Sequence, residues 1–450
     1  MSVLATLLCI KLTKSASPWY ADSATLRMGH VEHRGASLNW VTGRPELLKE
    51  INRRLVFDIL KNERSVSRPQ LARQTNLSRA TIAVIVDELL KRGLVTEVGL
   101  GSSSGGRPPV MVRFNPDAAF AVGACMHEYD WSLVVTNLDA MVQRRVRLHI
   151  PQQSPQAAIR TLHEGIERIT VGIDPSQLLP AVGLGTPGLV DIRTGVIKLA
   201  ADIGWQDIPF REMAEQALER SVFIANRSKV GALAELWYGA DRSVRDLIYI
   251  SIGTGVAAGI IHQGELLLGA NSSAGELGHV TILPDGPMCP CGNRGCLQQL
   301  VSEAAIANIA RERMRKDPGS LLYEVAGHHP ELISAIDVFQ AAERGDRTAR
   351  ETLLEVASYL GMAVANLVDL LNPELILLGG PVGEASPLLA DMIREEVRRR
   401  AMAYPLSAVQ ITQSSLGPEA GPIGASVLVL QRADELFFSR CMKEAADVGA

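Results

Sequence analysis

Beyond residue 115 the chain alternates short apolar segments of strand length with longer segments of helical periodicity, and this alternation restricts the fold more than any other feature. Strands are predicted at 119–125, 132–137, 181–184, 222–225, 247–252 and 374–378, and helices at 155–171, 228–237, 302–315, 346–371 and 386–402. Interleaved strands and helices form α/β domains, because helices cover the apolar faces of the sheet. A chain of 450 residues is too long for one typical domain, so two or three are expected.

A different pattern precedes this α/β region, between residues 46 and 114. The predicted elements are, in order, a helix over 51–60, a helix opened by the capping box Ser67 to Gln70, a helix from Ser78 to Gly93, a strand at 94–98, a loop at 99–106 and a strand at 110–114. Three helices followed by a two-stranded hairpin make a winged helix-turn-helix.

Charge is distributed unevenly between these two regions. Residues 46–113 hold twelve Lys or Arg against seven Asp or Glu, a net charge of +5, whereas the whole chain carries −4. A basic module on an acidic body is typical of a protein in which one domain alone meets phosphate. The sequence therefore favours binding of a double-stranded DNA operator through this module. The alternative is a protein–protein module whose arginines are merely solvated.

The second helix of a helix-turn-helix enters the major groove, and its N-terminal residues meet the base edges. Arg79 is a candidate for a bidentate contact with guanine. Arg107 lies in the glycine- and proline-rich wing, where an arginine suits a narrow minor groove. The predicted DNA-binding residues are Ser67, Arg68 and Gln70 near phosphate, Ser78, Arg79 and Thr81 at the start of the recognition helix, and Arg107 in the wing.

Three of the six cysteines, Cys289, Cys291 and Cys296, lie within eight residues of one another, and His279 precedes them. One histidine and three cysteines form a closed structural zinc set with no open coordination position, so catalysis by the metal is not expected. Free thiols or a Cys289–Cys291 disulfide are the alternatives, and both are less expected in a cytosolic protein.

These residues belong to a set of motifs that resembles the ROK family (repressors, open reading frames and kinases) over roughly residues 48–432. The motifs are Gly183–Gly188, Gly204-Trp205, Ser251–Gly255, Glu276–Cys296, Asn372–Gly380 and Gly421–Ala425. The N-terminal module looks like that of the family's xylose- and N-acetylglucosamine-responsive repressors. The resemblance implies a two-lobed actin-like, ribonuclease-H-type ATPase fold with a sugar pocket between the lobes, and assembly into homodimers or homotetramers.

Two departures from the family's kinases bear on catalysis. The kinases carry an Asp-x-Gly-Gly-Thr phosphate loop, whereas the corresponding segment here, Cys125 to Tyr129, brings bulk and a glutamate. The kinases also use an Asn-Asp pair whose Asp is the general base. This chain has Asn226-Arg227, and a guanidinium cannot accept a proton at neutral pH. The sequence therefore predicts no catalytic residues and no enzyme activity.

The resemblance implies a ligand pocket formed by Gly188, Asn226, Arg227, Glu276, His279 and Gln298. Arg227 and Gln298 replace carboxylates, so the pocket gains positive charge. One hypothesis is an acidic effector, such as a sugar phosphate or a sugar acid, held by Arg227. The alternative is that Arg227 pairs with Glu276 and fills the pocket. His279 is expected to serve both zinc and ligand, one through each ring nitrogen.

Together these features predict a cytoplasmic, homo-oligomeric repressor of carbohydrate genes that senses a sugar or sugar derivative, with no membrane span. A ROK-type sugar kinase with an added DNA-binding domain, or a DNA-binding protein that responds to no ligand, are the alternatives. The predicted divisions are an irregular extension (1–45), the winged helix-turn-helix (46–114), the ROK effector and oligomerisation domain (115–435) and a tail (436–450).

Overall fold

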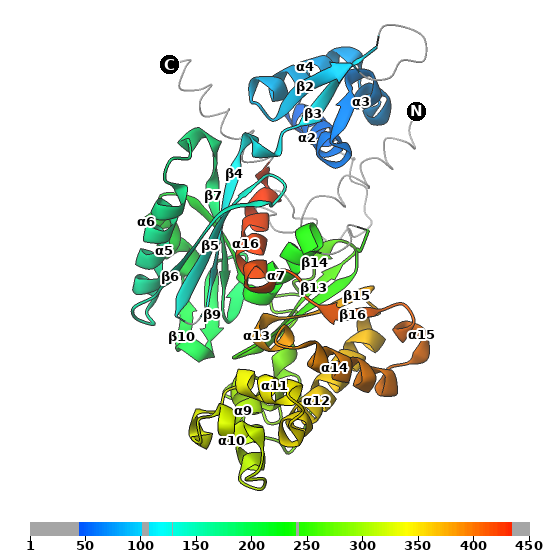
Figure 1. Ribbon diagram of the computed structural model, residues 1–450. Helices are drawn as coiled ribbons and strands as arrows, with labels where there is room; N and C mark the ends of the chain where they lie inside the picture. Colours follow the sequence, from blue (N-terminus) through cyan, green and yellow to red (C-terminus); the bar gives the residue numbers. More distant parts are fainter. Residues whose placement is uncertain (1–44, 101–107, 128, 240–242, 434–450) are drawn as a thin grey trace, which may run out of the picture.

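A computed structural model of the chain describes residues 45–100, 108–127, 129–239 and 243–433. All but the last residue of the predicted N-terminal extension, and the whole predicted tail, lie outside the described residues. Three parts follow one another along the molecule (Figure 1): a small helical part with a short sheet, then two larger lobes, each built on its own sheet.

The small part has the predicted winged helix-turn-helix pattern. Its elements are α2 (Pro45–Glu63), β1 (Ser65–Ser67), α3 (Arg68–Thr75), α4 (Arg79–Lys91), β2 (Val95–Leu100) and β3 (Val110–Phe114). Ser67 and Gln70 form the predicted capping box at the start of α3. Asn76 follows α3 with a φ of 56°, which lets the chain turn into α4, and Ser78 caps that helix as predicted.

Two details of this part differ from the prediction. The sheet has three strands in the order β1-β3-β2, because the three-residue strand β1, too short to show an alternating pattern, pairs with β3. Strand β2 also extends through Gly99, so the loop begins later than predicted, and the strand register shifts between Glu97 and Leu100. The remainder of the predicted loop, 101–106, lies outside the described residues.

The first lobe is a five-stranded sheet in the order β11-β7-β4-β5-β6. Its strands and helices are β4 (Phe120–Met126), β5 (Asp130–Asn137), β6 (Val142–His149), α5 (Pro155–Thr170), β7 (Leu178–Thr186), α6 (Phe210–Leu218) and β11 (Ser221–Asn226), with a small sheet of β8 (Leu189–Asp191), β9 (Val196–Ala200) and β10 (Trp205–Ile208). Helices α5 and α6 cover one face of the large sheet (Figure 1).

The second lobe contains a five-stranded sheet in the order β14-β13-β12-β15-β16. Its strands are β12 (Leu247–Ile252), β13 (Val256–His262), β14 (Glu265–Leu266), β15 (Leu375–Gly379) and β16 (Gln410–Gln413). Its helices are α8 (Gln298–Val301), α9 (Glu303–Met314), α10 (Leu321–Val325), α11 (Ala335–Glu343), α12 (Arg347–Leu371), α13 (Gly380–Gly383), α14 (Pro387–Arg400) and α15 (Ala403–Leu406).

Both large sheets share one topology. In each, the first three strands in chain order are antiparallel neighbours, and the last two add in parallel beside the first. The molecule is therefore the predicted two-lobed α/β fold of the actin-like, ribonuclease-H type behind a winged helix-turn-helix.

Several elements missing from the prediction lack a clear hydrophobic period, although the amphipathic helices α6 and α11 were missed as well. Strand β6 carries three arginines on an edge, and the second lobe's outer strands β14 and β16 are short. Helix α16 (Ala420–Leu430) is apolar on all sides, so no amphipathic pattern marks it. It returns from the second lobe to pack against β4, β7 and α7 (Arg227–Ala234).

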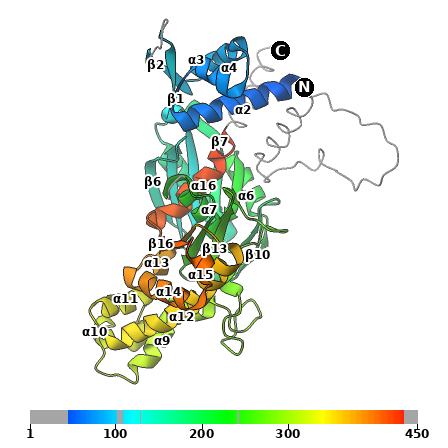
Figure 2. The same cartoon turned by 90° about the vertical axis from the view of Figure 1, so that its right-hand side faces the viewer.

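Helices α7 and α16 lie side by side between the two sheets (Figures 1 and 2). Strand β12 separates two apolar clusters, because its side chains alternate between the two faces of the sheet. Leu247 and Tyr249 belong to the cluster around α7 and α16, whereas Ile248 and Ile250 belong to the cluster around α12 and α14. The cluster around α7 also includes apolar residues of the winged helix-turn-helix. Helix α7 thus contacts both lobes.

Helix α12 is long and apolar enough to cross a membrane by length and composition alone, a property that the sequence reading did not note. Half of its most apolar 18-residue window is buried, and its buried residues belong to the core of the second lobe, against α9, α11 and α14. Such burial is typical of the core helix of a globular lobe.

Candidate DNA-binding face, metal centre and effector pocket

The start of α4 presents the predicted recognition residues. Ser78 accepts a hydrogen bond from the Thr81 amide at 3.0 Å, and the hydroxyls of Ser78 and Thr81 lie 2.9 Å apart. Arg79 is exposed and has no hydrogen bond or ion pair with any described residue. No described residue engages its guanidinium, and its contact with a base edge stays a prediction.

The residues predicted to lie near phosphate have partners of their own. Ser67 is only 2% exposed, and its hydroxyl and amide are bonded to Gln70, so in this structure Ser67 caps α3 and does not present a free hydroxyl. Arg68 forms ion pairs with Asp87 at 2.8 Å and Glu97 at 3.3 Å, so a phosphate contact would compete with these carboxylates. Gln70 is exposed. Arg107 lies outside the described residues.

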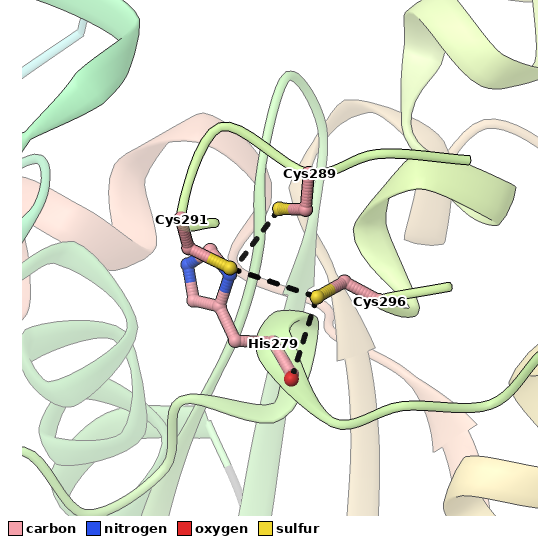
Figure 3. Close-up of side chains that lie close together, drawn as sticks. All are labelled: His279, Cys289, Cys291 and Cys296. Atoms are coloured by element: carbon pink, nitrogen blue, oxygen red, sulfur yellow. Dashed lines mark hydrogen bonds between the residues drawn. The ribbon is translucent and has the colours of Figure 1, made fainter. Parts of the chain in front are cut away.

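The four predicted metal ligands converge in the second lobe (Figure 3). Their ligand atoms all lie within 4.8 Å of one another: His279 Nδ1 is 3.7 Å from Cys289 Sγ, and the sulfurs of Cys291 and Cys296 are 3.7 Å apart. A tetrahedral zinc with bonds of about 2.3 Å to sulfur separates two sulfurs by about 3.8 Å. The spacing therefore fits a metal ion bound by four protein ligands.

The chemistry of this cluster also suits a metal. Each of its three cysteines is a free thiol, so the Cys289–Cys291 disulfide considered from the sequence is not formed. The side-chain amides of Gln298 and Gln299 lie 3.7 and 3.8 Å from Cys289 Sγ and point N–H groups at it, as the outer partners of a metal ligand do. Cys289 and Cys296 are buried, whereas Cys291 is exposed.

A cavity of about 110 Å³ between the two lobes contains all six predicted ligand residues. Its lining residues include Gly188, Asn226 and Arg227 from the first lobe and Glu276, His279 and Gln298 from the second. His279 faces this cavity while its Nδ1 lies beside Cys289, the double placement that the sequence predicts.

Asn226 is held rigidly at the cavity wall. Its side-chain N–H donates to the Gly188 carbonyl at 2.7 Å, and its side-chain oxygen accepts from the Ser228 amide at 2.8 Å and the Ser228 hydroxyl at 2.7 Å. Asn226 is therefore the N-cap of α7 and ties that helix to the loop after β7. Gly188 has a φ of 81°, which favours glycine, and a Cβ at this position would lie 2.3 Å from the Leu199 carbonyl oxygen.

Arg227 and Glu276 do not form the pair that was considered as an alternative. Glu276 lies near Lys229, whose side chain is buried. Burial raises the pKa of Glu276, and the charges of Lys229 and His279 oppose this rise. Arg227 is half-buried and forms no hydrogen bond or ion pair with a described residue. The cavity is therefore open and not filled by an Arg227–Glu276 pair.

Sequence reasoning missed Asp202, which lines the same cavity two residues before the Gly204-Trp205 motif. It also missed Lys229, because nothing in the sequence shows that this lysine is buried. A second cavity of about 410 Å³ adjoins the first and includes Cys125, His127 and Tyr129, from the segment that replaces the phosphate loop.

A winged helix-turn-helix joined to two lobes with a polar pocket between them defines a regulator that combines DNA binding and ligand sensing in one chain. The chain belongs to the ROK family: a sequence model of that family matches residues 128–432, and a model of winged helix-turn-helix DNA-binding domains matches residues 48–96.

Similar proteins include both repressors and kinases. The chain is 31% identical to the xylose repressor of Caldicellulosiruptor bescii over 391 residues, which cover 86% of this chain and 97% of the repressor. It is 37% identical to the glucokinase of Halalkalibacterium halodurans over 259 residues, 57% of this chain and 78% of the kinase. The crystal structure of a ROK family transcriptional regulator, a homologue of the E. coli MLC protein, superposes with a TM-score of 0.75 at 27% identity, covering 87% of this chain and 98% of that one.

Proposed function

We propose that this protein is a transcriptional repressor of carbohydrate genes that binds an operator through its winged helix-turn-helix and releases it when a sugar or sugar derivative enters the interlobe cavity. One observation carries the proposal: a helix-turn-helix with a free recognition arginine, Arg79, is joined to a ROK domain that has an open pocket. The similarity to a xylose repressor over 86% of the chain supports it.

Loss of phosphoryl transfer is part of this proposal. A basic side chain, Arg227, stands at the position of the general base, and Cys125 and Tyr129 occupy the segment of the phosphate loop. The similarity to glucokinases makes a sugar kinase the second candidate function. A coupled assay of ADP release over a panel of sugars separates the two, because a repressor without kinase activity releases no ADP above background.

We further propose that the Cys₃His cluster holds structural zinc. The protein is proposed to be cytoplasmic and to form a homodimer or homotetramer. Its proposed domains are residues 46–114 and 115–435. The close approach of four ligand atoms supports the zinc, which would fix the loop that carries His279 at the pocket. Oligomerisation is supported by family membership, since two DNA-binding domains can read two half-sites.

Helix α7 offers a physical route from the pocket to the DNA-binding part. It begins at Asn226 and Arg227 in the pocket and continues into a π-helical turn, Glu235–Gly239. Trp237 in that turn lies under the Nζ of Lys61 on α2, 4.3 Å from the ring centroid, and Arg64 at the end of α2 pairs with Asp139 of the first lobe. A ligand that shifts α7 would therefore change how α2 is held, provided that it prefers one arrangement over the other.

The proposal is tested by fluorescence anisotropy of the full chain on the DNA upstream of its own coding sequence, with and without neutral and phosphorylated sugars. We expect salt-sensitive, sequence-specific binding that one compound releases. Arg79→Ala should weaken specific binding at least tenfold, whereas the control Arg168→Ala, an exposed arginine on α5, should leave it unchanged. Specific binding that no compound changes would contradict the sensor role, and unaltered binding by the Arg79 variant would contradict the assigned DNA face.

A further inference from the structure

The two interlobe cavities meet at one place. Arg227, Ser251 and Gly255 line both the cavity of about 110 Å³, which contains Asn226 and Glu276, and the cavity of about 410 Å³ beside the end of β4. A ligand in the smaller cavity can extend a substituent through this junction towards the larger cavity. Arg227 is the positively charged side chain that lines both cavities.

Arg227 lines both cavities. Its charge acts on two groups at the end of β4, the Cys125 thiol and the His127 imidazole, whereas it is not among the charges that act on Glu276. Within the described part of the chain Arg227 has neither a hydrogen bond nor an ion pair, although it is half-buried. A partly desolvated arginine with no acidic partner among the described residues can bind an anion in that partner's place.

Most acidic side chains around the two cavities lie away from the junction or already have partners, although Asp202 Oδ2 is 3.6 Å from where a Cβ on Gly255, a junction residue, would lie. Asp202 and Glu276 line the smaller cavity, where carboxylates accept hydrogen bonds from hydroxyl groups. In the larger cavity Asp130 is already paired with Arg147 at 2.7 Å and lies 3.1 Å from His149, and Glu384 accepts the Gly380 amide at 3.1 Å.

Glu303, which also lines the larger cavity, has an interaction of its own. The positive groups at the junction are Arg227 and, further out, Arg147. The smaller cavity thus offers carboxylates to the hydroxyl groups of a ligand, and Arg227 adds a positive charge at one end of it.

We propose that the effector of this protein is a monosaccharide that carries an anionic substituent, a phosphate or a carboxylate, with its ring in the smaller cavity and the anion on Arg227. This inference rests on the proposed function and names the ligand class of that same pocket. It makes Arg227 the residue that determines specificity: the chain selects a charged sugar over its neutral parent, because only the charged one gives Arg227 a partner.

Isothermal titration calorimetry on the full chain tests the proposal with matched pairs of ligands. The probes are glucose, glucose 6-phosphate and glucuronate, N-acetylglucosamine and its 6-phosphate, xylose, and inorganic phosphate alone. We expect at least one charged sugar to bind ten- to a hundredfold more tightly than its neutral parent, since a charge-assisted bond contributes a factor of about that size. Phosphate alone should bind weakly, because it leaves the ring site empty. The phosphate and the carboxylate compounds separate the two sources of the anion.

Variants of position 227 test the role of the side chain itself. Arg227→Gln should abolish the preference for the charged sugar over its neutral parent, and Arg227→Lys should keep part of the preference. Arg227→Asp should reverse the preference. Arg168→Gln, an exposed arginine on the outer helix α5, is the matched control and should behave as the wild type. Thermal melting of each variant shows that it is folded.

Three results would overturn the proposal: a neutral sugar that binds as tightly as its charged derivative, a preference that survives in Arg227→Gln, or no binding by any charged sugar. Failure of the proposed function looks different. If a neutral sugar binds and releases the operator, the repressor function stands and the anionic ligand is wrong. If charged sugars bind through Arg227 but the chain binds no operator, the ligand class stands and the repressor function is wrong.

Discussion

At the scale of the residue, the Cys₃His cluster is the predicted site whose four ligand atoms all lie close together. Cys296 is fully buried, and its sulfur is 3.7 Å from that of Cys291. We expect Cys296→Ser to lose most of its bound zinc, measured by atomic absorption, and to melt at a lower temperature, because the metal no longer links the loop. Cys125→Ser, which changes a buried cysteine outside the cluster, should keep its zinc.

Chelation provides a second check on the same site. EDTA should lower the melting temperature of the wild type towards that of Cys296→Ser and leave the variant unaffected. Equal responses of both proteins to the chelator would show that the cluster does not hold the stabilising metal.

His127 gives the molecule a pH dependence that can be assigned to one residue. Burial and the nearby charges of Arg227 and Arg147 lower its pKa from 6.5 to about 4, although Asp130 acts in the opposite direction. The unfolded chain therefore takes up a proton between pH 6.5 and 4 that the folded chain does not, so the free energy of unfolding falls as the pH falls through this range. The loss is up to about 3 kcal/mol, with about 2 kcal/mol of it reached by pH 5.

Denaturant unfolding at pH 7 and pH 5 measures this effect when the wild type is compared with His127→Gln. The variant should lose about 2 kcal/mol less than the wild type over this interval, because carboxylates contribute equally to both proteins. An identical loss in the two proteins would mean that His127 is protonated in the folded chain at pH 5.

At the scale of the element, the capping box holds the start of α3. Ser67 Oγ accepts from the Gln70 amide, and the Gln70 side chain accepts in return from the Ser67 amide at 3.0 Å. Ser67→Ala should lower the free energy of unfolding of the winged helix-turn-helix by about 1 kcal/mol, measured by denaturant unfolding. Arg73→Ala, an exposed change inside α3, is the control and should cause no loss. A stable Ser67 variant would show that Gln70 caps the helix unaided.

The π-helical turn after α7 is one of the elements that contact the DNA-binding part. Trp237→Ala removes the ring beneath Lys61, so α2 should exchange its amide hydrogens faster and effector-induced release of DNA should weaken. Tyr238→Ala changes the neighbouring aromatic residue, which is 40% exposed, and should alter neither property. Faster exchange in α2 with unchanged release of DNA would place the coupling elsewhere.

At the scale of the whole molecule, the contact of α7 with α16 fixes the two lobes. A Cβ on Gly424 would lie 1.6 Å from the Val230 carbonyl oxygen, so the two helices approach as closely as glycine permits. Gly424→Ala should lower the free energy of unfolding by about 3 kcal/mol or more, because backbone must move in a core that is packed on both sides. Gly319→Ala, where a Cβ would meet only ordinary contact distance, should be close to neutral in the same denaturation experiment.

The sequence by itself determined the features that depend on neighbouring residues or on residue chemistry. Caps, turn residues and hydrophobic periods marked the winged helix-turn-helix, since Ser67 and Ser78 act within three residues of themselves. The α/β alternation predicted the class of the lobes, and the ligand types of His279 and the three cysteines predicted a metal cluster before any distance was known.

Only the tertiary structure decided what depends on segments far apart in the chain. Short edge strands and the uniformly apolar helix α16 acquire their structure from partners that the sequence does not place beside them. Asp202, Arg227 and Glu276 are separated by dozens of residues, so whether Arg227 pairs with Glu276 or faces the neighbouring cavity follows from the packing of two lobes and not from local pattern. Burial and charge pairing are properties of the folded molecule, and they determine which side chains remain available to a ligand.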